Sequence, residues 1–388
     1  MFGHWDVYSA YSYDKQDRRD IFMELKRLAV KNQGIHAYDI VIGESFEGLA
    51  AELKTLHVEN RRVCIVTESR VSGIYLDQLL TVLTPICREI SSYIFPEGEK
   101  EKNLHTVSQI YGELIQREFD RKDLLIALGG GVTGDLTGFT AATYLRGIDF
   151  VQVPTSLLSQ VDSSIGGKTG VDYDCYKNMV GAFYMPKLVY INTSTLQTLS
   201  ERQFISGMGE VIKHGLIRDK KYYEWIRCHI DQIMARENET LADMVEWSCR
   251  IKRAVVEEDP REKGIRACLN YGHTLGHAIE KLMDFRLTHG ECVGIGTVIA
   301  SYMSRQRGYL TQEEYQEIRA LYDAVGFPGL PKELEAEQIV SETRHDKKME
   351  QGRIKFILLK ELGQAEICQD VTEEEMLRSI QEAERESL

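Results

Sequence analysis

Three of the ten histidines in this sequence of 388 residues lie close together, in the stretch RACLNYGHTLGHAIEKLMDFRLTHGECVGIG at positions 266–296. His273 and His277 are four residues apart, so on a helix they stand on one face, one turn above the other. The opposite face carries an apolar stripe of Leu275, Ile279 and Leu282. The spacing therefore predicts a helix that packs by one side and presents two imidazoles on the other.

The imidazole group suggests two kinds of chemistry for these residues. It is the commonest transition-metal ligand in proteins and the usual proton carrier near neutral pH. The alternative is a pair of histidines on a solvated helix face, which the same spacing allows. His289 favours a site, because it has no place in an apolar pattern and directly precedes Gly290 and a second helical pattern that could return past the first.

An acidic residue on another predicted helix could complete such a site. Glu210 and Lys213 share a face at i and i+3, while Val211 and Ile212 would pack inward. One interpretation is a surface ion pair worth roughly a few tenths of a kcal/mol. The other makes Glu210 the anionic ligand of a zinc site with two histidines and an open position for substrate. The residues alone leave both interpretations open.

A glycine-rich turn follows the apolar run LLIAL. Gly129, Gly131 and Gly134 satisfy the GxGxxG pattern between a predicted strand and a predicted helix, where backbone N–H groups and a helix N-terminus can meet a pyrophosphate. A tight turn without a ligand is the alternative. The turn follows a third or later strand, so the acidic partner of a ribose hydroxyl is expected at Glu68 or within 97–100. The pattern indicates a dinucleotide site of unusual layout.

A second glycine-containing stretch, DSSIGGKTGVD at 162–172, suits anion binding. It contains the GKT triplet of a phosphate loop, but Asp162 stands where that loop needs its first glycine, so a nucleotide triphosphatase is not expected. Glycines allow close backbone approach, and Lys168 supplies a point charge. Other residues could contact the same anion or lie on the solvated surface: Arg146, Lys177, Asn178, Lys252, Arg266, Asn270, Lys347 and Lys348.

The elements that must position these residues change character near residue 200. Before it, short apolar runs alternate with helical patterns, which predicts a mostly parallel sheet covered on both faces. The runs lie at 38–43, 62–68, 90–95, 124–130, 149–155 and 188–192, with helical stretches such as 74–86 and 102–118 between them. After residue 200 the pattern is helical apart from a run at 353–359.

Ser200 marks the predicted start of the helical part. It can cap a helix, Gln203 can reach back to it, and Leu199 can pack on Phe204. We therefore predict an α/β Rossmann-like dinucleotide-binding domain over 23–199 and an all-α domain over 200–388. Residues 1–22 have no clear period and are interpreted as a leader, either an arm without regular structure or sequence ahead of the true start.

Composition excludes several classes of protein. The net charge of −13 argues against a general nucleic-acid binder, although a pocket can be locally basic in an acidic protein. Apolar runs fall short of the ~20 residues that cross a bilayer, and the first residues lack the pattern of a signal peptide, so no membrane partner is expected. The eight cysteines form no CxxC pair and are interpreted as reduced thiols of a cytoplasmic protein.

Several long motifs in one order resemble the 3-dehydroquinate synthase family of sugar-phosphate cyclases. They are PEGEKEK (96–102), LGGGVTGDLTGF (128–139), YLRG (144–147), VPTSLLSQVDSSIGGKTGVD (153–172), KNMVGAF (177–183), TLQTLSERQFISGMGEVIKHG (195–215), RACLNYGHTLGHAIE (266–280) and HGE (289–291). The resemblance runs from about residue 38 to about 360. It implies an N-terminal NAD-binding domain, a helical C-terminal domain with a divalent metal, zinc or cobalt, a substrate cleft between them, and a homodimer.

The resemblance also assigns roles to residues, and it changes the interpretation of the histidines. The implied metal ligands are Glu210, His273 and His289, with His277 facing the substrate. The implied NAD contacts are Glu97, Gly98, Glu99, Lys100, Glu101, Lys102, Gly131, Val132, Thr133, Gly134, Asp135, Thr155, Ser156, Lys168, Lys177, Thr195, Leu196, Gln197 and Thr198. The implied substrate contacts are Arg146, Asp162, Lys168, Asn178, Lys213, Lys252, Arg266, Asn270 and His277, joined by Lys347 or Lys348.

The reaction that the resemblance implies is the conversion of 3-deoxy-D-arabino-heptulosonate 7-phosphate to 3-dehydroquinate and phosphate, in the shikimate pathway to aromatic amino acids. NAD⁺ oxidises the C5 hydroxyl, phosphate leaves by β-elimination, the hydride returns, and an intramolecular aldol closes the carbocycle. A cluster of Lys and Arg would neutralise the carboxylate and phosphate of this anionic sugar phosphate.

Two rival activities share these features. Another sugar-phosphate cyclase, such as 2-deoxy-scyllo-inosose synthase, runs similar chemistry on a different sugar, but Asp162 and the pair Arg266 and Asn270 suit a substrate carboxylate that a plain hexose phosphate lacks. A metal-dependent polyol dehydrogenase would release NADH in step with its substrate.

Overall fold

The computed structural model describes residues 25–174, 176–284, 286–343, 349–350 and 353–386. The predicted leader over 1–22 and the candidates Lys347 and Lys348 lie outside these residues, as does Cys175. The seven described cysteines are free of disulfides, and most of them are buried. Among the described helices, none combines the length and apolar character that crossing a membrane requires.

A seven-stranded sheet forms the first half of the molecule. Its strands are β1 (Lys26–Asn32), β2 (Ile35–Gly43), β3 (Arg62–Glu68), β4 (Glu89–Phe95), β5 (Leu124–Gly129), β6 (Asp149–Pro154) and β9 (Leu188–Asn192). The order across the sheet is β1-β2-β9-β6-β5-β3-β4, and every pair is parallel except β1 with β2. The six apolar runs predicted as strands are confirmed. β1 was not predicted, because its exposed face leaves only Leu28 and Val30 buried.

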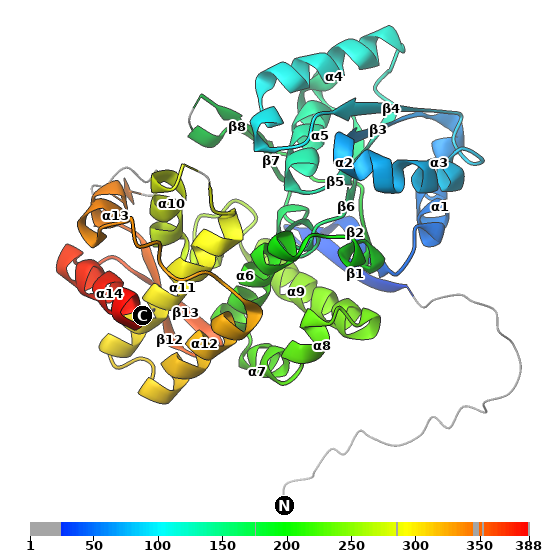
Figure 1. Cartoon of the computed structure of the whole chain (residues 1–388). Coiled ribbons are helices and arrows are strands. Elements are labelled where there is room, and N and C mark those ends of the chain that lie inside the picture. The colour runs from blue at the N-terminus through cyan, green and yellow to red at the C-terminus, as the bar shows by residue number, and fades with distance from the viewer. Residues whose placement is uncertain (1–24, 175, 285, 344–348, 351–352, 387–388) are drawn as a thin grey trace, which may run out of the picture.

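Helices cover both faces of this sheet because the side chains of each strand alternate between two apolar cores (Figure 1). On β5, Leu124 and Ile126 point into one core and Leu125 into the other. The covering helices are α1 (Glu47–Lys54), α2 (Ser69–Val71), α3 (Asp77–Leu83), α4 (Leu104–Gln116) and α5 (Gly131–Thr143). Short helical turns complete the connections: η1 (Val58–Asn60), η2 (Ser72–Leu76), η3 (Glu99–Glu101), η4 (Tyr144–Arg146), η5 (Ser159–Ser163) and η6 (Thr193–Gln197).

The second half is mainly helical, and the predicted fold class is confirmed. Its elements are α6 (Glu201–Arg218), α7 (Lys220–Cys228), α8 (Ile230–Met234), α9 (Asn238–Glu258), η7 (Ile265–Asn270), α10 (His273–Leu282), α11 (His289–Gln306), α12 (Gln312–Val325), α13 (Ala336–Thr343) and α14 (Glu373–Glu386). The run at 353–359 forms β11 (Arg353–Ile354) and β12 (Phe356–Glu361). These pair with β10 (Met349–Glu350) and β13 (Gln364–Cys368), which were not predicted.

One apolar core extends across the junction between the two halves. Ser200 caps α6, its Oγ accepting a hydrogen bond from Gln203 N at 3.4 Å, although no return bond from the Gln203 side chain is found in the described part of the chain. Ile40 and Val189 of the sheet share one apolar core with Met208 of α6. The division into two domains at residue 200 stays a prediction, because one core spans both sides of it.

A separate hairpin, β7 (Lys168–Tyr173) with β8 (Tyr176–Phe183), was also not predicted as strands. Glycines and polar residues interrupt its alternation, and several of its side chains are exposed. In Figure 1, β8 lies on the side of α5 that faces the α10 end of the helical half. The hairpin carries Lys168, Lys177 and Asn178, so it reaches from the sheet towards the helices with three of the predicted site residues.

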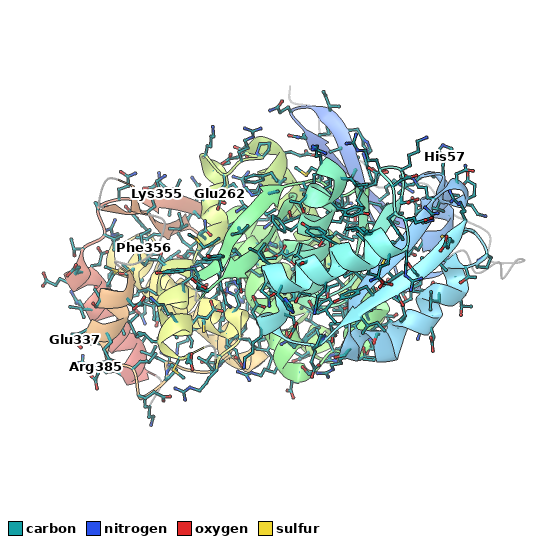
Figure 2. The ribbon with its side chains drawn as sticks, turned by 90° about the horizontal axis from the view of Figure 1, so that it is seen from above. His57, Glu262, Glu337, Lys355, Phe356 and Arg385 are labelled. Atoms are coloured by element: carbon teal, nitrogen blue, oxygen red, sulfur yellow. The ribbon has the colours of Figure 1, made fainter. Side chains whose placement is uncertain are left out.

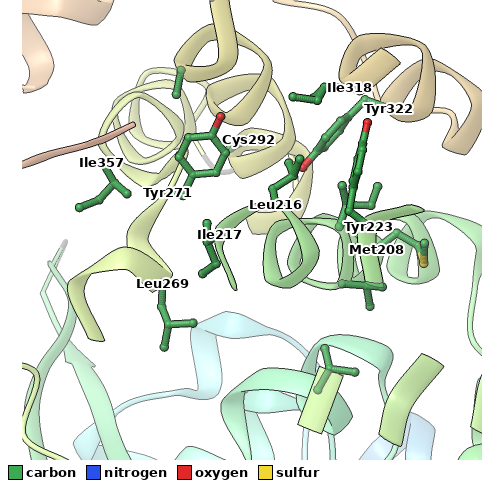
Figure 3. Close-up of a cluster of buried hydrophobic side chains, with 14 of the residues drawn as sticks. Met208, Leu216, Ile217, Tyr223, Leu269, Tyr271, Cys292, Ile318, Tyr322 and Ile357 are labelled. Carbon is green, nitrogen blue, oxygen red and sulfur yellow. The ribbon is translucent and has the colours of Figure 1, made fainter. Parts of the chain in front are cut away.

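Helices α6, α10 and α11 approach each other closely through glycines. A Cβ on Gly276 of α10 would lie 3.0 Å from the carbonyl oxygen of Cys292 in α11, and one on Gly209 of α6 would lie 3.1 Å from that of Gly290. Figure 3 shows the apolar side of this contact, where Met208, Leu216 and Ile217 of α6 lie among buried tyrosines. The close backbones place the start of α10, the start of α11 and the middle of α6 together.

Candidate functional site

Three imidazoles cluster between these helices, and a carboxylate lies against one of them. Glu210 comes from α6, His273 and His277 from α10, and His289 is the first residue of α11. The ring centroid of His273 lies 5.2 Å from those of both His277 and His289, and one nitrogen of each ring lies within 4.8 Å of the others. Glu210 Oε1 lies 3.7 Å from His273 Nε2. The three imidazoles therefore form one cluster, and Glu210 reaches it through His273.

Hydrogen bonds at Nδ1 determine which ring nitrogen can face a cation. His273 Nδ1 lies 3.1 Å from the carbonyl oxygen of Tyr271, which can only accept, so this nitrogen carries the proton. His289 Nδ1 lies 3.4 Å from Glu280 Oε2, a second acceptor. Each ring then offers the lone pair of Nε2, which is the arrangement that second-shell acceptors produce in metal sites.

Glu210 needs a cationic partner because its side chain is almost completely buried, with 1% of the residue exposed. Neither of its carboxylate oxygens accepts a hydrogen bond in the described part of the structure. Lys213, one turn further along α6 and equally buried, forms an ion pair with Oε2, whereas Oε1 faces His273. The interpretation as a surface ion pair is therefore wrong, because Glu210 and Lys213 pair in the interior. A buried carboxylate and oriented imidazoles are a donor set that fits a divalent metal.

A second group of donors lies next to the first but is less suited to a metal. Ligand atoms of Asp162, Glu210 and His214 also lie within 4.8 Å of one another. Two ammonium groups already pair with its carboxylates, Lys252 with Asp162 and Lys213 with Glu210. A further cation there would be repelled, so the histidine cluster is the better candidate.

Several of the predicted substrate contacts pair with opposite charges, some buried and some partly exposed. Lys168 of β7 forms an ion pair with Glu262 Oε2, and Asn270 Nδ2 donates to Glu262 Oε1 at 3.0 Å. Figure 2 shows Glu262 on the helical half, so this contact joins the two halves. Arg266, 2% exposed, donates to the carbonyl oxygen of Pro260 at 2.9 Å.

The charges of this network shift one another's pKa values. Burial alone would raise the pKa of Asp162, but the charge of Lys252 and the contacts with His214 and Lys213 outweigh it and hold this pKa well below its ordinary value. Burial lowers the pKa of Lys252, and Asp162 opposes that shift. Burial also lowers the pKa of Arg266 against the charges of Glu262 and Asp162. Such shifts in one place are typical of a functional site.

The predicted cofactor residues lie at the carboxyl ends of the sheet strands. β5 ends at Gly129 and α5 begins at Gly131, so the glycine turn connects strand and helix as predicted. Thr155 follows β6, and its N–H donates to the carbonyl oxygen of Gly129 at 3.0 Å. A Cβ on Gly131 would lie 3.2 Å from Ser163 Oγ, so a side chain here would crowd the turn. This edge fits a dinucleotide.

Other predicted cofactor residues surround this turn. Lys102 is buried and pairs at 2.6 Å with both Asp135 of α5 and Asn178 Oδ1 of the hairpin. Thr195 Oγ1 accepts from Gln160 at 2.9 Å, and Thr198 contacts Tyr75. Glu68 instead caps α2 by accepting from Arg70 and Val71. Asn178, predicted to contact the substrate, therefore lies with the cofactor residue Lys102.

Arg146 stands apart from the other predicted residues. It is exposed in the turn after α5, with a left-handed backbone at φ 70°. In the described ranges, no hydrogen bond or ion pair joins it to the residues above. Glu97, another outlying candidate, lies after β4, where its N–H donates to Ser69 Oγ at 3.1 Å.

Sequence reasoning missed three residues that the structure places at the site. Glu280 contacts both His289 and Lys177, Glu262 contacts Lys168 and Asn270, and His214 lies buried beside Asp162. A signal was present for Glu280, which stands seven residues after His273, two turns along the same helix face. His214 stands four residues after Glu210 in the same way. For Glu262, in the loop after α9, the sequence gives no periodic signal.

Comparison with known proteins identifies the relatives of this fold and site. The chain matches the sequence models of the 3-dehydroquinate synthase N-terminal region over residues 92–206 and C-terminal region over residues 207–349. The 3-dehydroquinate synthase of Nitrosospira multiformis is 46% identical over 321 residues, which cover 82% of this chain and 88% of that protein. This chain belongs to the 3-dehydroquinate synthase family.

Solved structures of more distant cyclases share the fold. The 2-epi-5-epi-valiolone synthase of Streptomyces hygroscopicus, with NAD⁺ and Zn²⁺ bound, is 23% identical with a TM-score of 0.83 over 90% of this chain and 97% of that one. A 2-deoxy-scyllo-inosose synthase with carbaglucose-6-phosphate, NAD⁺ and Co²⁺ is 24% identical with a TM-score of 0.83 over 92% and 99%. These structures confirm the predicted fold, and the sequence models and relatives confirm the family.

Proposed function

We propose that this protein is a 3-dehydroquinate synthase that converts 3-deoxy-D-arabino-heptulosonate 7-phosphate to 3-dehydroquinate and phosphate, a carbon–oxygen lyase of the shikimate pathway. One observation carries the proposal: Glu210 contacts His273 in a cluster of three histidines, beside buried lysines, in a chain of this family. A metal site next to clustered cations suits an anionic sugar phosphate.

Two bound groups complete the site. NAD would accept and return a hydride, and a divalent zinc or cobalt ion would polarise substrate oxygens. Relatives with the same fold bind NAD⁺ together with Zn²⁺ or Co²⁺. Glu210, His273 and His289 would hold the metal. The backbone of 131–135 and the N-terminus of α5 would hold the pyrophosphate, with Lys102, Thr155 and Ser156 close by.

The chain's own charges bind and orient the substrate. Three lysines are each paired with a carboxylate of the protein: Lys168, Lys213 and Lys252. The carboxylate and phosphate of the substrate would replace these carboxylates or bind beside them. Arg266, held by the loop before η7, supplies a fixed guanidinium for a planar oxyanion. Because Lys213, Lys252 and Arg266 are buried, their charges act with little screening by solvent, whereas Lys168 is exposed.

His277 is the residue best placed to move a proton. It stands one helical turn after His273, partly exposed, with its ring 5.7 Å from that of His289. An imidazole at that position can take or give a proton next to the polarised oxygens without coordinating the metal. Lys213, fixed beside Glu210, would hold a substrate hydroxyl or carboxylate.

The proposed function also implies an oligomeric state, a cellular location and a pathway. We propose a homodimer in the cytoplasm that serves chorismate and aromatic amino acid biosynthesis and binds neither nucleic acid nor membrane. The net charge of −13 and the free thiols of the described cysteines support this setting.

The test is to incubate the purified protein with the heptulosonate phosphate, NAD⁺ and Zn²⁺ or Co²⁺. We expect free phosphate and a carbocyclic 3-dehydroquinate, with no net rise in NADH absorbance. A stoichiometric rise in NADH would instead indicate a polyol dehydrogenase. Phosphate release from a hexose phosphate, with none from the heptulosonate, would indicate a cyclase of the 2-deoxy-scyllo-inosose synthase type.

A further inference from the structure

Glu280 lies between the candidate metal ligands and the β7–β8 hairpin. Its residue is 4% exposed, and its two carboxylate oxygens have different partners. Oε2 lies 3.4 Å from His289 Nδ1, whereas Oε1 accepts from Lys177 Nζ at 2.8 Å. One carboxylate thus contacts a candidate metal ligand on one side and a candidate cofactor contact on the other.

The three residues come from three separate elements. Glu280 is on α10, two turns after His273, while His289 begins α11 and Lys177 is the second residue of β8. The β7–β8 hairpin forms its own two-stranded sheet, outside the seven-stranded one. Its ion pairs to the helical half include Lys177 with Glu280 and Lys168 with Glu262. Glu280 is therefore placed to fix the hairpin and a metal ligand at once.

We propose that Glu280 is a positioning residue that orients the His289 imidazole towards the metal and ties the cofactor-side hairpin to the same point. The inference rests on the proposed function, because it assumes that His289 binds a metal and that Lys177 lies near NAD. Glu280 itself touches neither the reacting atoms nor the cofactor.

The His289 side of this role follows from imidazole chemistry. A carboxylate that accepts from Nδ1–H fixes the tautomer and ring orientation, which leaves the Nε2 lone pair facing the cluster and makes it a stronger donor. The side chain of His289 is 31% exposed, so neighbouring side chains alone leave its ring room to rotate. The other candidate ligand, His273, is held by a backbone carbonyl and needs no such side chain.

The Lys177 side follows from the cost of a buried charge. Removal of either partner of a buried pair leaves the other charge uncompensated. The side chain of Glu280 is 6% exposed and that of Lys177 is 31% exposed, so water can solvate Lys177 after the loss of Glu280 more readily than Glu280 after the loss of Lys177. Loss of Glu280 should release both contacts, whereas loss of Lys177 should loosen the hairpin and leave His289 oriented.

The experiment compares Glu280→Gln, Glu280→Ala and Lys177→Met with the unaltered full chain. Metal affinity is measured by competition of Zn²⁺ and Co²⁺ against a chelator, ligand geometry by the visible absorption of the Co²⁺ form, and hairpin mobility by hydrogen exchange of the peptides from 168–183. Glu375→Ala is the matched control, because Glu375 forms an ion pair with Arg307 on the helical half, in a contact that includes none of the site residues.

We expect Glu280→Ala to weaken metal binding by about 10- to 100-fold and to change the Co²⁺ spectrum. Glu280→Gln keeps an acceptor for Nδ1, so it should recover part of the affinity while hairpin exchange remains faster. Lys177→Met should speed hairpin exchange with metal affinity within about twofold of the parent, and Glu375→Ala should change neither. Because Glu280→Gln is nearly isosteric, it gives a readout even where Glu280→Ala fails to fold.

An unchanged metal affinity and Co²⁺ spectrum in folded Glu280→Ala or Glu280→Gln would overturn the inference. Equal rates of hydrogen exchange for the hairpin in the parent, Glu280→Gln and Lys177→Met would overturn the claim that Glu280 fixes the hairpin. Failure of the proposed function is a different result, because the unaltered protein would then bind no metal at His289 or release no phosphate from the heptulosonate.

Discussion

The two halves of the site are built in different ways. On the sheet side, the candidate cofactor contacts depend on backbone: a glycine turn after β5, the N-terminus of α5 and the ends of β6 and β9. On the helical side, the candidate metal centre depends on side chains from α6, α10 and α11, each held by a specific neighbour. The sheet side should therefore be sensitive to added side-chain volume, and the helical side to the loss of single polar atoms.

The largest effect should come from removing a metal ligand. Glu210→Ala, His273→Ala and His289→Ala should each lose bound metal and lower turnover at least about 1,000-fold, or about 4 kcal/mol of transition-state stabilisation. Metal analysis alongside the phosphate-release assay measures both, and a chelator should reproduce the loss in the parent protein.

His277→Ala is the control for this set, because its ring lies in the same cluster. It should keep the metal while turnover falls. Metal loss in His277→Ala together with metal retention in Glu210→Ala would mean that the three imidazoles, and not the carboxylate and two imidazoles, hold the ion.

A smaller effect should follow from adding volume on the sheet side. Gly131→Val would place a branched side chain at the first residue of α5, where a Cβ alone lies 3.2 Å from Ser163 Oγ. We expect NAD affinity to fall at least about tenfold, or about 1.4 kcal/mol, with metal content unchanged. Titration of NADH fluorescence measures it. Unaltered NAD binding in folded Gly131→Val would remove this turn from the cofactor site.

The same contrast explains what could be predicted from sequence. Six strands of the large sheet, the glycine turn and the Ser200 cap were predicted because each is a local pattern of contiguous residues. The β7–β8 hairpin was missed because its glycines and exposed side chains break the alternation that marks a strand. The family resemblance supplied the grouping of Glu210 with His273 and His289, which spacing alone left open.

The partners of the site residues were harder to predict than the residues themselves. Glu262 and Lys168 are 94 positions apart and meet only through the tertiary fold. Glu280 carried a helical spacing signal, yet nothing in the sequence pairs it with Lys177 on a distant hairpin. Neutralising carboxylates are required by burial of the lysines, so their presence could be expected, but their identities depend on how the halves pack.

The smallest effect concerns how the helical side holds Arg266. The Asp259 carboxylate accepts backbone N–H groups of Lys263, Gly264 and Arg266 at 2.9, 2.7 and 3.2 Å, which shapes the loop between α9 and η7. Asp259→Asn keeps an acceptor but loses the charge, so unfolding free energy should fall by about 1 kcal/mol. Urea denaturation measures the difference, and an equal stability of both proteins at neutral pH would contradict it.

The pKa of Asp259 determines how the difference in unfolding free energy between the parent and Asp259→Asn changes with pH. Burial opposes ionisation of Asp259, but the three backbone N–H donors and the charge of Arg266 together outweigh it and lower its pKa below the ordinary 3.8. A carboxyl group with a lowered pKa stabilises the folded state above its unfolded pKa and loses that contribution as pH falls through its folded pKa. The difference in unfolding free energy between the parent and Asp259→Asn should therefore stay constant from pH 7 to 5 and become smaller below about pH 3.8. If this difference became smaller between pH 7 and 5, a group other than the Asp259 carboxylate would stabilise the loop between α9 and η7.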